Sequence, residues 1–345
     1  MGKLYKAGHG VEMQFDKGNI TLCSNGGTLW PDWLEKAGIS RKDVKSIHVA
    51  EGTVKLPENS SGTNGVEYKV FGGLYKIVSI DLNRFDTSNV TNMYGMFAGC
   101  YQLKSPDLSK FDTSKVTNMA CMFYNCYEIT SLDLSGFDTS NVTGMHSIFD
   151  GCETLTRLNL SSLDTSSVTD MSDMFAGCEG LTNLDLSSFN TASVTDMRSM
   201  FAGCEALTRL NLSSFDTSSV TDMSNMFAGC EGLTNLDLSS FDTSNVTDMG
   251  WMFSGCRGLK NPDLGGFDTS NVANMSGMFY NCGSLTNLDL NNFDTSSIED
   301  MSFMFSGCIK LKQIILNTVT EQDTDTTGMF DGCSSGLIYK KPDVR

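Results

Sequence analysis

The cysteines are the first residues whose spacing points to chemistry. Ten of the 12 form a ladder with a constant 26-residue step, except that the last step is one residue shorter. The ladder comprises Cys100, Cys126, Cys152, Cys178, Cys204, Cys230, Cys256, Cys282, Cys308 and Cys333. Regularly spaced thiols suit a metal site, disulfides or an apolar core. A metal site needs paired cysteine or histidine spacing, and stacked parallel Cβ vectors do not point at one another as a disulfide requires. We therefore expect buried, reduced cysteines, with no metal or cofactor. Cys23 and Cys121, outside the ladder, are the candidates for exposed or paired thiols.

A ladder of aspartates begins each D-T-S segment. Its members are Asp86, Asp112, Asp138, Asp164, Asp216, Asp242, Asp268 and Asp294. Calcium sites supply several oxygens per turn with glycine spacing, which is not seen here. An aspartate before Thr-Ser readily accepts hydrogen bonds from backbone N–H groups two residues on, and Asn190 fills the same place without charge. We predict that this ladder builds turns.

A second aspartate series lies between inward-facing leucines. It comprises Asp107, Asp133, Asp185, Asp237, Asp263 and Asp289. Alternation along a strand predicts that these side chains point outward. Like charges at strand spacing repel, and the series is interrupted by two asparagines, each with an arginine two residues before it. Both a solvated face and a partner surface fit this pattern. The candidate binding residues on it are Arg157, Asn159, Asn183, Asp185, Arg209, Asn211, Asp237 and Asp263.

Two aromatic residues, Trp251 and Phe303, occupy a variable position that elsewhere holds Gly95, Ser147 or Asp173. They either fill grooves between packed elements or form a second contact patch. We add both to the candidate binding residues.

The sequence offers little support for a catalytic site. His9, His48 and His146 are isolated, and the spacing assembles no Ser/His/Asp or Cys/His constellation. We therefore predict no catalytic residues, since an enzyme would need a divergent site near the N-terminus. A gap-free threonine ladder from Thr87 to Thr295 suggests ice binding as a further alternative. We disfavour it, because these threonines stand beside Asp in a turn.

The elements that position these residues follow the same 26-residue period. Phenylalanine and methionine rows share the cysteine register, from Phe97 to Phe305 and from Met93 to Met301. Within one unit, apolar residues from Val220 to Cys230 fall on one face of a short helix, and Gly229 suits its end. Leu233 to Phe241 follows with the L-x-x-L-x-L spacing of a short strand.

Stacking these units turns every apolar position into a continuous ladder. The predicted fold class is an α/β repeat solenoid, a leucine-rich-repeat-like right-handed superhelix with a parallel sheet and short helices. Its strands should centre near Leu82, Leu108, Leu134, Leu160, Leu186, Leu212, Leu238, Leu264, Leu290 and Leu316.

The ends of the chain depart from the repeat. We predict an N-terminal capping region over residues 1–79, tandem repeats over 80–317, and an altered last repeat with a C-terminal cap over 318–345. The N-terminal region has a Ser, Gly and Asn-rich stretch from Asn59 to Gly65, and alternation at Ile47, Val49 and Val54 to Leu56 predicts extra strands. In the last repeat Thr318 to Thr327 replaces the F-D-T-S segment. Caps are expected because open strand edges invite pairing with other chains.

Charge limits the partners. The formal net charge is −17, and no apolar run approaches the roughly 18 residues of a membrane span. We expect no nucleic-acid binding and no membrane insertion. A neutral or basic protein or glycan ligand, bound by a monomer, fits better. Met1 to Lys6 lacks the apolar core of a secretory signal, so we expect no leader there.

The segment from Leu184 to Cys204, close to L-D-L-S-x-F-D-T-S-x-V-T-x-M-x-x-M-F-x-G-C, resembles the 26-residue repeat of bacterial BspA-like leucine-rich proteins. The resemblance spans about residues 80–333, and Leu29 to Leu56 resembles the region preceding such arrays. Departures are Ile148, Leu163, Pro106 and Pro262. The resemblance implies a bacterial cell-surface or secreted protein involved in adhesion and host interaction. A cytoplasmic location is the alternative.

Two functions fit these residues and this resemblance. The first is a non-catalytic, surface-displayed recognition or adhesion scaffold that binds a host or bacterial macromolecule through the solenoid face. The second is a passive spacer or stalk that sets the reach of another domain. The near-identical units from Ser162 to Ser239 favour the spacer.

Overall fold

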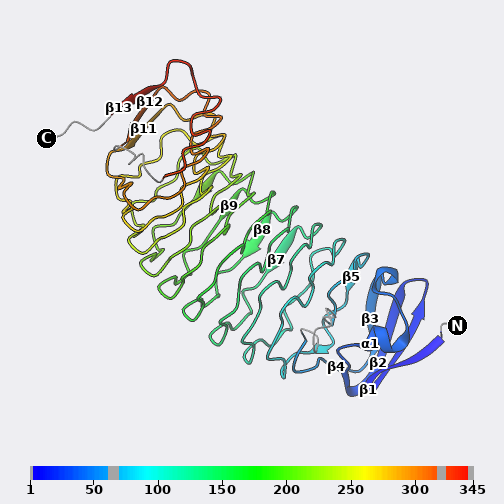
Figure 1. Cartoon of the computed structure of the whole chain (residues 1–345). Helices are drawn as coiled ribbons and strands as arrows, with labels where there is room; N and C mark the ends of the chain where they lie inside the picture. The colour runs from blue at the N-terminus through cyan, green and yellow to red at the C-terminus, as the bar shows by residue number, and fades with distance from the viewer. Residues whose placement is uncertain (1–2, 61–69, 317–323, 341–345) are drawn as a thin grey trace. The chain divides into compact units, whose positions relative to one another are not determined.

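The computed structural model describes residues 3–60, 70–316 and 324–340. It forms two compact units, Met1–Ser167 and Val168–Arg345. Within each unit the chain winds in turns of one repeat length, and each turn pairs with the next (Figure 1). The predicted boundaries at 79/80 and 317/318 stay predictions. Residues 61–65 of the Ser, Gly and Asn-rich stretch and residues 318–323 of the altered last repeat lie outside the described residues.

The N-terminal unit begins with an antiparallel hairpin. Strand β1 (Lys3–Asp16) pairs with β2 (Asn19–Leu29) through a two-residue loop in which both residues have positive φ, 48° at Lys17 and 96° at Gly18. Such loops match the natural twist of paired strands. The helix α1 (Trp33–Ala37) and the 3-10 helix η1 (Arg41–Asp43) follow.

A parallel sheet joins this hairpin to the first turns. β2 pairs with β3 (Ser46–Glu51) and β4 (Val54–Lys55), which pair in turn with β5 (Ser79–Ile80) and β6 (Phe85–Asp86). The extra strands predicted around Ile47, Val49 and Val54 are therefore confirmed. Beneath them, the buried Trp33 ring donates a hydrogen bond from Nε1 to the Val70 carbonyl at 3.0 Å.

The repeat strands pair in parallel, one turn apart. In the N-terminal unit β7 (Ser131–Asp133) pairs with β8 (Arg157–Asn159). In the C-terminal unit β9 (Asn183–Leu184) pairs with β10 (Arg209–Leu210), and β11 (Asn287–Leu290), β12 (Gln313–Leu316) and β13 (Ile338–Lys340) form a three-stranded sheet. These pairs confirm a parallel sheet in both units.

Regular strands are fewer than predicted. The segments centred on Leu108, Leu238 and Leu264 have no strand assignment. In two of them a proline, Pro106 or Pro262, stands in the middle of the expected strand and offers no backbone N–H to a neighbouring turn. The strand prediction was wrong at these places.

The predicted short helices are also wrong. Within the described part of the repeats these segments form turns, and each contains two residues in the left-handed region, as at Asn225 and Gly229, with φ of 57° and 73°. Below, the left-handed position means the first of the two. A residue of this conformation interrupts a right-handed helix. The backbone bonds instead join neighbouring turns: the N–H groups of Met223, Asn225 and Phe227 donate to the carbonyls of Asp248, Gly250 and Met252 at 2.9–3.0 Å.

The core is built from the predicted rows. The phenylalanines of the Phe97–Phe305 row are fully buried, and within each unit their rings stack on those of neighbouring turns. In the C-terminal unit the Phe201 and Phe227 centroids lie 5.7 Å apart with an interplanar angle of 6°. The right-handed sense of the superhelix stays a prediction. Among the described residues, no helix is long and apolar enough to cross a membrane.

Candidate functional site

Most of the described repeat turns have three corners built by Asp or Asn side chains, although Gly144 and Ile315 each take the place of one such side chain. In one turn of the C-terminal unit, Asp237 Oδ1 accepts from the Ser239 N–H at 3.0 Å, Asp242 Oδ1 from the Ser244 N–H at 3.0 Å, and Asp248 Oδ1 from the Gly250 N–H at 2.8 Å. We call these positions the first, second and third corners. The predicted turn-building role of the D-T-S aspartates, at the second corner, is confirmed. The first corner, which we considered as a binding stripe, uses the same bond.

These hydrogen bonds keep the exposed corner carboxylates ionised. The Ser239 hydroxyl and backbone N–H lower the pKa of Asp237, and the Ser244 hydroxyl and N–H lower the pKa of Asp242. A hydrogen bond to the charged form of a carboxylate favours that form. Asp237 and Asp242 therefore carry negative charge at neutral pH, whereas Asn159, Asn190 and Asn211 make the same corner bond without charge.

The threonine ladder is internal. Thr217 is 1% exposed, and its hydroxyl donates to the Asp242 carbonyl at 2.9 Å while accepting from the Asp242 N–H at 2.8 Å. The same pair of bonds recurs at Thr113 with Asp138 and at Thr243 with Asp268. Because these hydroxyls are buried between turns, the ice-binding alternative is excluded for this ladder.

The cysteine ladder also belongs to the core. The Cys230 thiol is buried and donates to the Phe201 carbonyl of the previous turn at 3.1 Å. Burial raises the pKa of Cys204 and Cys256 to about 12, so these thiols stay protonated and unreactive. The prediction that the ladder cysteines are buried is confirmed, with Cys333 half-buried, and their reduced state stays a prediction.

The two cysteines outside the ladder, Cys23 and Cys121, are half-buried. Cys121 has a left-handed backbone, with φ of 55°. It accepts a hydrogen bond from the Tyr94 hydroxyl, which raises the pKa of Tyr94 to about 12.

The histidines do not come together. His48 Nδ1 lies 3.1 Å from Asp81 Oδ2 on the surface, His9 contacts Trp30 edge-on, and His146 lies against Tyr94. Across residues 3–60, 70–316 and 324–340, no cluster of three or more His, Cys, Asp or Glu side chains could hold a metal ion.

The first-corner residues and the residues two positions before them form one surface, which we call the first-corner face. All eight candidates from the second aspartate series and its flanking column lie on this face and are exposed. Arg157 and Asn159 lie on β8 in the N-terminal unit, where the Asn159 amide donates to Asp133 Oδ1 at 3.0 Å. The other six lie in the C-terminal unit, where Asn183 on β9 pairs in register with Arg209 on β10. The outward orientation predicted for these side chains is confirmed.

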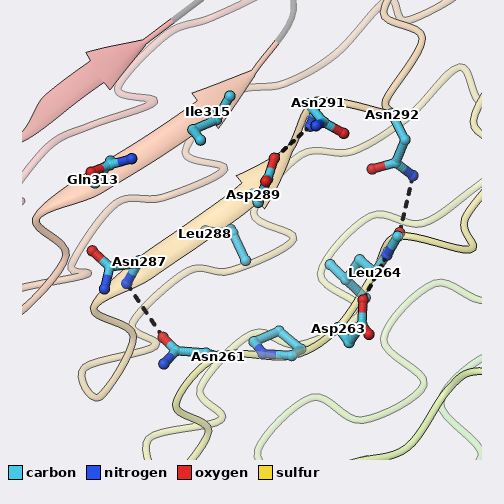
Figure 2. A pocket seen from close by; sticks show the side chains of 12 residues that line it. Asn261, Asp263, Leu264, Asn287, Leu288, Asp289, Asn291, Asn292, Gln313 and Ile315 are labelled. Carbon is cyan, nitrogen blue, oxygen red and sulfur yellow. Dashed lines mark hydrogen bonds between the residues drawn. The ribbon is translucent and has the colours of Figure 1, made fainter. Parts of the chain in front are cut away.

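The first-corner face of the C-terminal unit contains a groove of about 450 Å³. Figure 2 shows Asn261 and Asp263 on one turn, Asn287 and Asp289 on β11, and Gln313 on β12. We call this the strand-face groove. The remaining lining residues are Pro262, Leu264, Gly265, Leu288, Asn291, Asn292 and Ile315. Of our candidates only Asp263 lies in it.

The polar lining of the groove is rigidly held. Asp263 Oδ1 accepts from the Gly265 N–H at 3.0 Å, and Asp289 Oδ1 from the Asn291 N–H at 3.1 Å. Asn292 Nδ2 donates to the Leu264 carbonyl at 3.0 Å and so ties two turns together (Figure 2). Fixed amides and carboxylates above an apolar floor can hydrogen-bond a ligand without first being ordered.

Sequence analysis missed Asn261, Asn287 and Gln313. They occupy the same column of the repeat as Asn183 and Arg209, and that column was the available signal. The repeat pattern does not indicate at which turns the residues of this column line a groove.

Trp251 and Phe303 stand at the left-handed position of their turns, with φ of 59° and 56°. A Cβ atom added at Gly277 would lie 2.5 Å from the Trp251 ring, and one added at Gly328 would lie 2.5 Å from the Phe303 ring. Each ring therefore covers a glycine of the next turn. The Trp251 and Phe303 rings therefore fill space between neighbouring turns, and not the grooves between helices that we had considered.

Stacked 26-residue turns define the chain as a tandem-repeat solenoid protein. The family described as "Mycoplasma protein of unknown function, DUF285" matches it over residues 68–175, 124–235 and 229–337. Because these matches span most of the chain, the protein belongs to this family.

Two solved structures are similar to the chain at low identity. A leucine-rich repeat protein from Eubacterium ventriosum is 16% identical, with 99% of this chain and 97% of that chain covered and a TM-score of 0.46. TLR13, in its complex with ssRNA13, is 14% identical, with 90% of this chain and 51% of that chain covered and a TM-score of 0.29. A comparison with curated proteins gave no match.

Proposed function

We propose that this protein is a non-catalytic recognition scaffold that binds a protein or glycan ligand through its first-corner face. The observation that supports the proposal most directly is the strand-face groove, where five amide side chains and two carboxylates surround an apolar floor. Repeat solenoids present extended surfaces of this kind for binding. The stacked core of the C-terminal unit then serves to hold that surface rigid.

The charge of the face defines the ligand class. Asp185 and Asp237 are exposed, and their pKa values are lowered by bonds from Ser187 and Ser239. Ionised carboxylates at strand spacing repel phosphate groups and attract cations. A neutral or basic ligand is therefore proposed, and a nucleic acid is disfavoured.

We further propose that the protein is displayed on the bacterial cell surface or secreted, and that its role is adhesion. The BspA-like repeat phrase from Leu184 to Cys204 supports this location. Antibody labelling of intact cells that produce the full-length protein tests it. Labelling that requires lysis would favour the cytoplasmic alternative.

A passive spacer is the second candidate function. The near-identical units from Ser162 to Ser239 favour it, because copied turns extend reach without creating distinct contacts. A spacer should bind no ligand through its first-corner face.

The test compares the full chain with the triple variant Asp185→Asn, Asp237→Asn and Asp263→Asn. Asparagine keeps the corner bond, as Asn159 and Asn211 do at 3.2 and 3.1 Å, so the fold should survive while three charges are lost. We expect slower association of the variant with a partner purified on the wild-type chain, and a flatter salt dependence. Equal association of both chains would contradict the proposal.

A matched variant, Asn261→Ala with Asn287→Ala, removes two amides of the strand-face groove. Asn235→Ala, in the same column outside the groove, is its control. Loss of affinity in the pair and not in the control would place the contact in the groove.

A further inference from the structure

A separate surface of the C-terminal unit carries two exposed aromatic rings in an unusual backbone setting. In this unit the left-handed position holds, in order, Asp173, Ser199, Asn225, Trp251, Gly277, Phe303 and Gly328. Small or polar residues tolerate this conformation, whereas bulky aromatic residues rarely adopt it. Here each aromatic residue is followed, one turn on, by a glycine. We call Trp251 and Phe303 the aromatic pair.

The rings lie over those glycines. A Cβ atom at Gly277 would meet Trp251 Cδ2, Cε3 and Cε2 at 2.5, 2.6 and 2.7 Å. Three atoms of one ring at nearly equal distance mean that the ring turns its face toward the glycine. At Gly328 the Cβ would meet Phe303 Cε1 and Cδ1 at 2.5 and 2.7 Å. The two glycines therefore provide room for rings that lie down on the surface.

A ring whose inner face covers a glycine presents its outer face away from the backbone. Phe303 is 38% exposed, and Trp251 is half-buried beside Tyr280, with ring centroids 5.3 Å apart. The backbone strain at Trp251 and Phe303 brings no burial of the kind seen in the phenylalanine row. The conformation itself is common to this position of the repeat, so the unusual feature is a large, partly exposed ring in a backbone setting that bulky residues rarely adopt, and this feature points to a binding role.

The spacing of the pair defines a linear ligand. Backbone bonds join these turns without a break: Trp251 N–H to Ser276, Gly277 N–H to Ser302, and Phe303 N–H to Thr327, all at 2.8–2.9 Å. Neighbouring strands lie ~4.8 Å apart, so the two rings repeat at roughly 10 Å along the stack. This is about the length of a disaccharide unit in an extended β-1,4-linked chain. The C–H face of a sugar ring packs well on the negative face of an aromatic ring.

The carboxylates beside the aromatic pair restrict the chemical class of the ligand further. Asp331 Oδ2 lies 3.1 Å from the position of a Gly328 Cβ, so a carboxylate borders the Phe303 platform. The third-corner residues Asp300 and Asp325 bridge neighbouring turns three positions before Phe303 and Gly328. Carboxylates accept hydrogen bonds from sugar hydroxyls and repel anionic polymers. We propose that the aromatic pair binds an uncharged, extended β-1,4-linked glycan chain along the stack.

This surface is distinct from the strand-face groove, which contains neither aromatic residue. Its test uses the full chain and cellohexaose as probe, with affinity measured by isothermal titration calorimetry. Asparagine tolerates the left-handed conformation, so Trp251→Asn and Phe303→Asn remove the rings without adding strain. We expect each to weaken cellohexaose binding at least 10-fold, and the double variant to abolish it. The matched control is Asn225→Ser. Asn225 occupies the left-handed position one turn before Trp251 and carries no ring, so this variant should bind cellohexaose as the wild type does.

Three further measurements sharpen the test. Cellobiose is too short to reach both rings and should bind at least 10-fold more weakly than cellohexaose. Gly277→Asn should displace the Trp251 ring and weaken binding while both aromatic residues remain. Hexalysine tests the rival occupant, a cationic peptide held by cation–π contacts. Ring-dependent binding of hexalysine without binding of cellohexaose would overturn the glycan proposal.

No detectable binding of cellohexaose by the wild-type chain, or unchanged binding by the double variant, would also overturn it. Either result leaves the first-corner proposal standing, because that proposal rests on Asp185, Asp237 and Asp263. Conversely, loss of partner binding in the first-corner variants would leave the glycan titration unaffected.

Discussion

The third corner of the turn carries no charge in most of the N-terminal unit and aspartate in most of the C-terminal unit. Asn92 and Asn118 occupy it in the first unit, where their Oδ1 atoms accept from the Tyr94 and Ala120 N–H groups at 2.8 and 2.9 Å. In the second unit Asp196 and Asp222 accept from the Arg198 and Ser224 N–H groups at 2.9 and 2.8 Å. The corner geometry needs an acceptor oxygen and not a charge.

A second difference lies in the residue after each ladder cysteine. Tyr101 and Tyr127 stack on one another in the first unit, with ring centroids 4.9 Å apart, and Tyr75, one turn before the ladder begins, lies tilted with its centroid 5.2 Å from that of Tyr101. Glu153 ends this tyrosine series within the first unit, and the second unit has Glu179, Glu205 and Glu231 at the same position, followed by Arg257, which pairs with Glu231 at 3.0 Å. The buried rows are the same in both units, so the surface positions are where the two units have diverged.

The largest expected effect comes from the shared core. Phe123→Ala in the first unit and Phe227→Ala in the second should each lower the free energy of unfolding by about 3–5 kcal/mol, because each empties a site between two stacked rings. Denaturant unfolding followed by circular dichroism measures both. A cost below about 1 kcal/mol in either unit would break the equivalence of their cores.

A smaller loss is expected from the buried threonines. Thr113→Val and Thr217→Val keep the shape of the side chain but leave the N–H and carbonyl of the facing aspartate without partners. Each substitution should lower the free energy of unfolding by about 1–3 kcal/mol. The control is Thr221→Val, since Thr221 is exposed and bonds a single carbonyl at 3.2 Å. A control as costly as the buried pair would mean that burial does not set the penalty.

The first corner should distinguish charge from geometry. Asp237→Ala removes the acceptor for the Ser239 N–H and should cost about 0.5–1.5 kcal/mol, whereas Asp237→Asn keeps it and should be nearly neutral. Asp133→Ala and Asp133→Asn repeat the comparison in the first unit. Equal losses for Ala and Asn would show that the negative charge itself stabilises the corner.

The smallest effect concerns pH. Desolvation raises the pKa of Asp196, and the Asp170 and Asp222 carboxylates add to the rise, while the N–H and charge of Arg198 oppose it. A folded-state pKa above the unfolded value means that the folded state holds the proton more tightly. Asp196 therefore costs stability once the pH rises from below its ordinary pKa of 3.8 through the raised folded value.

Asp196→Asn should accordingly stabilise the protein at pH 7, by about 0.5 kcal/mol or less because the carboxylate is partly exposed. The gain should vanish below the ordinary aspartate pKa. Asn118→Asp, the converse change in the first unit, should destabilise at pH 7 and not at pH 3. Thermal melts of the wild type and both variants across this range provide the measurement, and a gain for Asp196→Asn that persists at low pH would argue against a charge effect.

The sequence by itself determined the 26-residue period, the buried rows and the turn-building aspartates. These features are local or strictly periodic: an Asp-x-Ser corner closes between near neighbours in the chain, and an apolar residue repeated every turn must be buried in the stack. The outward orientation of Asp185 and Asp237 followed in the same way from alternation along a strand.

Only the tertiary structure decided how the segment from Val220 to Cys230 is folded. Its apolar spacing fits a helix face, yet Asn225 takes a left-handed conformation and its N–H bonds the Gly250 carbonyl in the next turn. At the same position Cys, Ser, Asp, Trp and Phe adopt this conformation elsewhere, so residue type gave no warning. The backbone bonds that select it come from the neighbouring turn, and no local pattern contains them. The strand-face groove and the placing of Trp251 over Gly277 depend on the same contacts between turns, which is why stacking, and not the repeat alone, defines the surfaces on which ligands are proposed to bind.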